Sequence, residues 1–331
     1  MTNFRAYRVH ENTDGTFSHG IETRSIDDLP AGEVLIRVHY AGLNYKDALS
    51  ARGNKGVTRR YPHTPGIDTA GTVVSSQVAD FEEGQEVIVT SYDLGMNTDG
   101  GFGEYIRVPA AWIVPKPNTL SLAQSMILGT AGFTAALALH QLLKNGQDPA
   151  QGGILVTGAT GGVGSMAVGM LAQAGFSVLA LTGKTDAHDY LHTLGATEIL
   201  PREAAQDESK RPLLKPQWAG AIDTVGGSIL ATALKACSRH GNVAACGLVL
   251  SPQLQTTVFP FILNGINLLG IDSERCPMPL RRQLWQHMAT DWRIPVLDEL
   301  ALFAPLQDLD THIERILKGQ VRGRVVVDLT K

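Results

Sequence analysis

A chain of 331 residues, 44% hydrophobic and 18% charged, is long enough for about two domains with packed cores and gives no case for disorder. The formal net charge is −4 and no basic tract runs along the sequence, so neither nucleic acid nor a membrane is an expected partner. Three cysteines without a Cys-x-x-Cys pair exclude a disulfide framework and fit a cytoplasmic protein. We see no signal peptide and no apolar run of membrane-spanning length.

The first 120 residues are typical of an irregular β-rich domain. Residues 33–38 alternate in part like a half-buried strand, and residues 85–90 form another candidate strand after a Glu-Glu-Gly turn. Near residue 120 the pattern changes. Ser121 is a candidate helix cap, and apolar residues then recur at helical spacing through Leu143.

Strands and helices alternate from Gly153 onward, which predicts a parallel, doubly wound sheet of the Rossmann kind. After residue 296 a helix and a short strand follow, and we expect the last strand to rejoin the N-terminal domain. The fold class is therefore α/β, with a β-rich domain at 1–122 and 297–331 and a cofactor domain at 123–296. From Gly153 onward the predicted strands are 154–157, 176–181, 219–225, 242–247 and 324–327. One predicted helix ends before Gly175, and two others cover 187–194 and 306–317.

The strongest motif is the glycine-rich turn 156–165, Val-Thr-Gly-Ala-Thr-Gly-Gly-Val-Gly-Ser, between a predicted strand and a predicted helix. Glycines let the backbone approach a pyrophosphate, and the helix N-terminus offers unpaired N–H groups. A strict G-x-G-x-x-G would need glycine where the chain has Ala159. We assign cofactor contact to four residues of this turn, namely Thr160, Gly161, Gly162 and Val163.

The end of the second strand favours NADP over NAD. An NAD site places a carboxylate there for the ribose 2′-hydroxyl, whereas this chain has Thr182, Gly183 and Lys184. A hydroxyl and an ammonium suit a 2′-phosphate. Asp186 follows two residues later and is better explained as a cap for the next helix.

Taken together, the segments 41–47, 65–71, 128–135 and the glycine turn resemble the medium-chain dehydrogenase/reductase family over essentially the whole chain. The resemblance implies a GroES-like catalytic domain beside a Rossmann NADPH-binding domain. Residues 218–226 and 267–273 are similar to the zinc-free, quinone-oxidoreductase-like branch, which includes bacterial acryloyl-CoA reductases.

The residues at the family's zinc-ligand positions predict a metal-free site. Asn44 stands where zinc relatives have a cysteine, and Ile67 where they have a histidine. The third ligand would fall near Gly129 and Thr130, which offer neither thiol nor imidazole, although a catalytic zinc needs three protein ligands. We therefore expect reduction of an electrophile that accepts hydride without a Lewis acid, either a quinone or a C=C conjugated to a carbonyl.

By the same resemblance, Tyr45 lies beside the nicotinamide and could orient substrate or relay a proton, or could simply pack. Asn44 and Asp47 position substrate or brace the cleft, and Asp68 has a structural role. The remaining residues implied in cofactor binding are Arg202 at the adenosine phosphate and Leu248, Ile262, Ser273 and Arg324 on the nicotinamide side.

The leading interpretation is an NADPH-dependent reductase of a short enoyl-CoA such as acryloyl-CoA. The alternatives are a quinone reductase and a non-catalytic NADPH-binding protein, and the sequence shows no compact basic patch for CoA. The apolar stretch 267–272 predicts an edge strand that joins two copies of the chain as a homodimer.

Overall fold

The computed structural model describes residues 2–331, and they divide into two compact units. Unit 1 comprises Met1–Thr130, Glu274–Trp285 and Leu297–Lys331, with Met1 outside the described residues. Unit 2 comprises Ala131–Ser273 and Gln286–Val296. The predicted first domain ended at residue 122, whereas the division falls after Thr130, and Glu274–Trp285 groups with unit 1 rather than with the cofactor domain.

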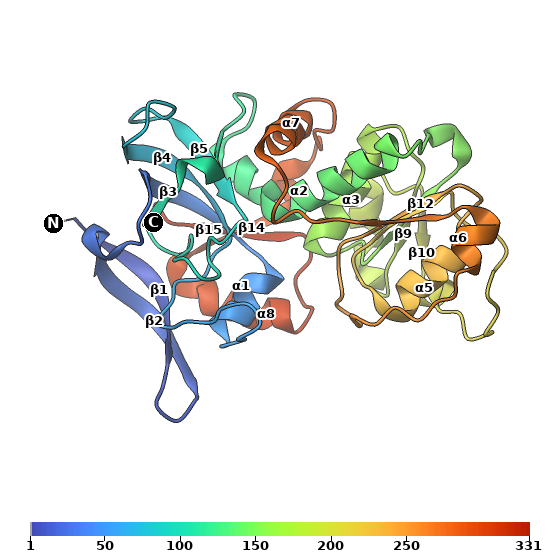
Figure 1. The fold of residues 1–331 in the computed structure, drawn as a ribbon, viewed down its shortest axis with the longest axis horizontal. Coiled ribbons are helices and arrows are strands. Elements are labelled where there is room, and N and C mark those ends of the chain that lie inside the picture. The colour runs from blue at the N-terminus through green and yellow to red at the C-terminus, as the bar shows by residue number, and fades with distance from the viewer. Residues whose placement is uncertain (1) are drawn as a thin grey trace. The chain divides into compact units, whose positions relative to one another are not determined.

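Unit 1 is built on a mixed seven-stranded sheet whose order is β14-β15-β3-β4-β5-β7, with β6 pairing with β3 (Figure 1). Its pairs are antiparallel except β14 with β15, so the C-terminal strand does rejoin the N-terminal part of the chain. The strands are β3 (Val34–Leu43), β4 (Asp68–Ser76), β5 (Glu86–Thr90), β6 (Tyr105–Val108), β7 (Ile113–Pro115), β14 (Ala301–Pro305) and β15 (Arg324–Asp328).

A hairpin and two helices complete this unit. The hairpin strands β1 (Asn3–Glu11) and β2 (Phe17–Ser25) form a separate two-stranded sheet, and α1 (Tyr45–Ala51) packs against α8 (Leu309–Leu317). Apolar side chains of β3, β4, β5 and β15 form the core, together with the buried side of α8. This core fixes the position of α1, which carries Tyr45.

Unit 2 contains a six-stranded, all-parallel sheet of order β10-β9-β8-β11-β12-β13, with helices on both sides (Figure 1). The predicted doubly wound fold is confirmed. The strands are β8 (Ile154–Thr157), β9 (Val178–Leu181), β10 (Glu198–Leu200), β11 (Gly220–Asp223), β12 (Asn242–Ala245) and β13 (Asn267–Gly270). The helices are α3 (Gly162–Gln173), α4 (His188–Thr193), α5 (Gly227–Lys235) and α6 (Phe259–Asn264).

Two helices cross the division between the units, α2 (Leu122–Lys144) and α7 (Met278–Ala289). The predicted cap of α2 is confirmed, because the Ser121 hydroxyl accepts the Gln124 N–H at 3.0 Å. Gly129 interrupts the helix with φ 49° and ψ −153°. A Cβ there would lie 2.4 Å from Asp68 Oδ2, so the break and the buried carboxylate require glycine together.

By length and composition, α2 alone among the helices of residues 2–331 could cross a membrane. We expected no such run in the sequence, so that expectation is wrong. However, 83% of its most apolar window is buried inside the protein. In this fold α2 is therefore a core helix.

Candidate functional site

A buried polar cluster forms where four elements of unit 1 meet. Asn44 follows β3 and precedes α1, Asp68 begins β4, Thr130 follows the break in α2, and Arg324 begins β15. The Asp68 carboxylate accepts hydrogen bonds from Asn44 Nδ2 at 2.8 Å, Thr130 N at 2.7 Å and Thr130 Oγ1 at 2.5 Å. The cluster therefore fixes Asn44, and with it the start of α1.

Arg324 directs its guanidinium into this cluster. It donates to the carbonyls of Leu43 at 3.0 Å and Ile127 at 3.1 Å and to Asn44 Oδ1 at 3.0 Å. Arg324 is 3% exposed, and burial lowers the pKa of its guanidinium. We expected Arg324 to line the nicotinamide side, but in unit 1 its donors face protein acceptors. These contacts indicate that Arg324 stabilises the buried cluster.

Asp47 is completely buried and holds the first turn of α1. Its two carboxylate oxygens accept the backbone N–H of Asn44 and of Ile67, each at 2.8 Å. Burial, and secondarily the nearby Asp68, raises its pKa to about 7. Of the two roles left open by the sequence, these contacts favour bracing.

Tyr45 is the only one of the three predicted catalytic residues whose side chain is well open to solvent. It is 45% exposed, whereas Asn44 is 9% and Asp47 0% exposed. Its neighbour Lys46 pairs with Glu274 at 2.7 Å, which ties α1 to the segment before α7. Tyr45 can therefore contact a ligand directly, while Asn44 and Asp47 fix its position.

One residue beside this cluster, Ser91, has no signal in the sequence. Its hydroxyl lies 3.1 Å from Thr130 Oγ1 and its N–H donates to Ile67 O at 2.8 Å. Both Ser91 and Tyr92 adopt positive φ, 65° and 52°. Such conformations are uncommon outside glycine and recur at functional sites, but no residue pattern announces them.

Among residues 2–331, no group of three or more His, Cys, Asp and Glu side chains is placed to hold a metal ion. At the family's zinc-ligand positions, the Asn44 amide is hydrogen-bonded to Asp68 and Arg324, and Ile67 has no donor side chain. The donor set therefore does not fit a catalytic zinc.

In unit 2 the glycine turn links β8 to α3, as the sequence predicts. Gly158 has φ 59°, and a Cβ on Gly164 would lie 2.2 Å from Gly158 O. Thr157 Oγ1 donates to the buried Asp223 at 2.7 Å and holds β8 beside β11. The turn therefore brings bare backbone to the N-terminus of α3, where Gly161, Gly162 and Val163 are half-buried and Thr160 is buried.

The end of β9 presents the predicted phosphate-binding groups. The buried Thr182 hydroxyl accepts the Lys184 N–H at 3.1 Å. A Cβ on Gly183 would lie 3.8 Å from Arg202 Nε and Nη2, so the exposed guanidinium packs beside this glycine. Three predicted residues are thus brought together. Asp186 does not cap α4, because it lies inside the short 3-10 turn Thr185–Ala187 and the α4 N-cap is Ala187.

The three residues expected on the nicotinamide side of unit 2 do not share one location. Leu248 follows β12 and Ser273 follows β13, at the carboxyl end of the sheet, where Ser273 accepts a hydrogen bond from Thr134 at 2.9 Å. Ile262 lies on α6, which bonds through Asn264 O to His240, just before β12 begins. Within this chain, Ile262 is therefore at the opposite, amino end of the sheet.

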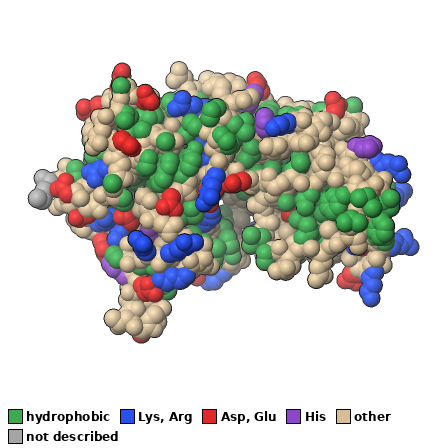
Figure 2. Space-filling model, in the orientation of Figure 1, with side chains coloured by type: hydrophobic (Ala, Val, Ile, Leu, Met, Phe, Trp, Pro, Cys, Tyr) green, Lys and Arg blue, Asp and Glu red, His purple; other side chains and the backbone are tan. Residues whose placement is uncertain are grey.

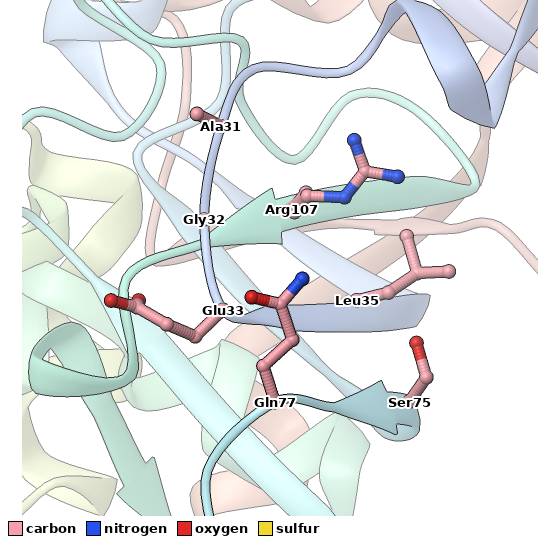
Figure 3. A pocket seen from close by; sticks show the side chains of 7 residues that line it. All are labelled: Ala31, Gly32, Glu33, Leu35, Ser75, Gln77 and Arg107. Carbon is pink, nitrogen blue, oxygen red and sulfur yellow. The ribbon is translucent and has the colours of Figure 1, made fainter.

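A separate hollow of about 480 Å³ opens on unit 1 beside β3, β4 and β6 (Figure 3). Its charged groups are already engaged: Arg107 donates to the carbonyls of Ile26 and Leu29, and Glu33 accepts the Ala110 N–H. It shares no residue with the buried cluster or the glycine turn. The remaining lining residues are Ala31, Gly32, Leu35, Ser75 and Gln77.

Two family models match the chain. The alcohol dehydrogenase GroES-like domain matches residues 30–118, and the zinc-binding dehydrogenase model matches residues 162–290. The acrylyl-CoA reductase AcuI of Ruegeria pomeroyi is 44% identical over 327 residues, covering 98% of this chain and 99% of its own.

YhfP of Bacillus subtilis, named a putative quinone oxidoreductase, is 46% identical over 332 residues, covering 99% of both chains. Its crystal structure with NAD bound superposes with a TM-score of 0.96 and covers 99% of this chain and 100% of that one. The yhdH oxidoreductase of Salmonella enterica in complex with NADP is 42% identical, with a TM-score of 0.94 and coverage of 98% and 99%.

The GroES-like domain of unit 1 and the parallel sheet of unit 2, with its glycine turn, define a two-domain oxidoreductase. The chain belongs to the medium-chain dehydrogenase/reductase family, in its zinc-free, quinone-oxidoreductase-like branch.

Proposed function

We propose that this protein is an NADPH-dependent reductase of a short enoyl-CoA, with acryloyl-CoA reduced to propanoyl-CoA. One observation carries the proposal: at the family's ligand positions the chain has a closed Asn44–Asp68–Arg324 cluster rather than a metal donor set. Such a site suits an electrophile that accepts hydride unaided, and a C=C conjugated to a thioester carbonyl is one.

NADPH fits the groups in unit 2. The turn at Gly158 and Gly164 has no room for side chains, which allows a pyrophosphate to approach the start of α3. Thr182, Lys184 and Arg202 gather a hydroxyl and two cations at the end of β9, which suits a 2′-phosphate. The Salmonella relative with NADP supports this choice, and the Bacillus relative with NAD argues for testing it.

When bound, NADPH supplies the hydride, which goes to the β-carbon while a proton goes to the α-carbon. This chain contributes position: the buried cluster and Asp47 hold the start of α1, and Tyr45 presents its phenol to the ligand. The phenol orients the thioester carbonyl or donates the proton.

The second candidate is a quinone reductase, favoured by the name of the Bacillus relative. A third, of another class, is an NADPH-binding protein without turnover. Measuring NADPH oxidation with acryloyl-CoA, with a quinone and with neither separates the three. We expect rapid oxidation with acryloyl-CoA, unchanged after exhaustive chelation. Turnover of the quinone alone, or of neither compound, would contradict the proposal.

We also propose a homodimer joined through β13. This strand is at the edge of its sheet, and Leu268 is 38% exposed. The exposed face continues over α6, where Ile262 is 68% and Leu263 54% exposed, and Figure 2 shows a broad hydrophobic area on that part of unit 2. Antiparallel pairing about a twofold axis would satisfy both edges and cover these side chains. It would also bring α6 of one copy to the carboxyl end of β13 in the other, where Ile262 was expected.

We place the protein in the cytoplasm. Its three cysteines are free thiols, and burial raises the pKa of Cys237 and Cys246 to about 12. Thiols held protonated in this way are inert and suit a reducing compartment.

A further inference from the structure

We found no compact basic patch for CoA in the sequence, but the segment between Asp47 and Asp68 is basic in a chain whose net charge is −4. Residues 48–67 contain no Asp or Glu, and they carry four cations, which are Arg52, Lys55, Arg59 and Arg60. The segment begins inside α1, the helix that presents Tyr45, and ends at the Pro-Gly turn before β4. Its charge therefore lies close in sequence to Asn44 and to Asp68, two members of the buried cluster.

Two of the four cations are neutralised by protein groups. Arg52 Nη2 lies 2.7 Å from Asp310 Oδ1 and 2.7 Å from Glu314 Oε1 of α8. Lys55 Nζ lies 2.5 Å from Glu11 Oε2 and 4.9 Å from the centre of the Tyr61 ring. These side chains hold the segment in place and leave no charge for a ligand.

Arg59 and Arg60 differ from them. Both are exposed, and neither makes an ion pair or a side-chain hydrogen bond with any residue from 2 to 331. Their backbone is nevertheless fixed on both sides. Thr58 Oγ1 lies 2.7 Å from Ser50 Oγ, and the Tyr61 hydroxyl donates to Ser50 O at 2.8 Å. Two adjacent guanidinium groups are thus held on an ordered turn and remain in solvent.

This turn is anchored to the last part of α1, within reach of the position of Tyr45. Ser50 follows Tyr45 by five residues, which is about 7.5 Å along a helix axis. Figure 2 shows Lys and Arg side chains gathered over the part of unit 1 that carries α1 and α8. A ligand that reacts beside Tyr45 and carries a polyanion on a flexible arm could engage both places at once.

An acyl-CoA has this form. Its pantetheine arm is as long as about four extended residues, or about 14 Å, and is joined through a pyrophosphate to an adenosine that carries a 3′-phosphate. Arginine binds phosphate oxygens through pairs of parallel N–H donors, so two free guanidinium groups match such an end. We propose that Arg59 and Arg60 bind the phosphates of the CoA part of the substrate and so set the preference for CoA thioesters. This inference rests on the proposed function.

The test compares two thioesters of the same acid. Acryloyl-CoA carries the phosphates, and the acryloyl thioester of N-acetylcysteamine lacks them. In Arg59→Ala/Arg60→Ala the KM for acryloyl-CoA should rise about tenfold or more, and in Arg59→Glu/Arg60→Glu further, with kcat nearly unchanged. Neither KM nor kcat for the N-acetylcysteamine thioester should move. High salt should raise the KM for acryloyl-CoA in the native protein and have little effect in the variants.

Arg239→Ala is the matched control, because Arg239 is also exposed but precedes β12 at the amino end of its sheet. This variant should change neither KM nor kcat for either thioester. Unaltered KM for acryloyl-CoA in the double variants, or equal losses on both thioesters, would overturn the inference. Equal melting temperatures of all variants would exclude a folding defect.

Failure of the proposed function would be visible separately, as native protein that reduces a quinone but neither thioester. In that case calorimetry with free CoA, on protein saturated with NADP⁺ to block the dinucleotide site, still decides the inference. Binding that is lost in Arg59→Glu/Arg60→Glu and kept in Arg239→Ala would support it. No binding, or binding that persists in the glutamate variant, would overturn it.

Discussion

Asp68 Oδ2 lies 3.5 Å from Arg324 Nη2, although the two residues are 256 positions apart in the sequence and are 0% and 3% exposed as side chains. A carboxylate and a guanidinium so deeply buried are stable only while each satisfies the other and the surrounding donors and acceptors. This pair ties the first residue of β4 to the first residue of β15 and thereby holds Asn44 between them.

Removing the Arg324 cation should therefore destabilise the folded protein. Arg324→Met should lower the free energy of unfolding by about 3–5 kcal/mol, because it leaves Asp68 buried without its countercharge. The double variant Arg324→Met/Asp68→Asn should recover part of that loss in urea unfolding. No recovery would show that the two charges are not coupled. A guanidinium that contacted the cofactor would instead lower NADPH affinity in both variants.

Lys184 should set the cofactor preference. Native protein should bind NADPH at least about tenfold tighter than NADH, a difference of about 1.4 kcal/mol. Lys184→Ala should remove most of that difference and leave NADH binding nearly unchanged, because only NADPH carries the 2′-phosphate. Fluorescence titration with each cofactor measures the two affinities, and Lys215→Ala, at an exposed lysine, is the control. Equal affinities in the native protein would refute the assignment.

Tyr45→Phe should lower turnover while leaving NADPH affinity nearly intact. The exposed phenol is the predicted substrate contact, and general acid catalysis contributes about 10²–10⁴-fold. Stopped-flow measurement of NADPH oxidation gives the rate, and Tyr105→Phe in β6 serves as control. A decrease smaller than about threefold would mean that Tyr45 only packs near the ligand.

The buried Asp47 should make stability fall as the pH rises. Its folded pKa is raised from 3.8 to about 7, so between these values the folded protein holds a proton that the unfolded chain has released. The resulting stabilisation is complete below the unfolded pKa and is lost as the pH rises through about 7, by at most about 1.4 kcal/mol per pH unit.

Urea unfolding at pH 5 and pH 7.5 tests this. The difference in unfolding free energy between the two pH values should be smaller in Asp47→Asn than in native protein. The exposed Asp80→Asn should leave the difference as it is. Parallel pH profiles of native protein and Asp47→Asn would contradict the raised pKa.

The edge strand β13 should mediate dimerisation. Leu268→Lys places a charge on this edge and should give a monomer that still binds NADPH. Leu302→Lys is the matched control, because Leu302 is 48% exposed on β14, the edge strand of the other sheet. Sedimentation velocity at micromolar concentration measures both. Native protein that sediments as a monomer would disprove the dimer.

The sequence by itself determined the features that depend on neighbouring residues. The order of strand, glycine turn, helix and second strand requires Gly158 and Gly164 because backbone passes close by, and such local patterns are visible along the chain. In the same way Thr182, Gly183 and Lys184 were found at the end of β9 because the glycine turn fixes where that strand must follow.

Tertiary structure decided the features that depend on distant partners. The sequence could not show that Arg324 would be enclosed by Asn44 and Asp68, or that Ser91 would take a left-handed conformation against Thr130. Nor could it separate Arg52, whose partners on α8 are about 260 residues away, from Arg59 and Arg60, which have none among the described residues. Charge pairing in a folded chain is set by the packing of elements far apart in sequence, so only the assembled core shows which charges are left for a ligand.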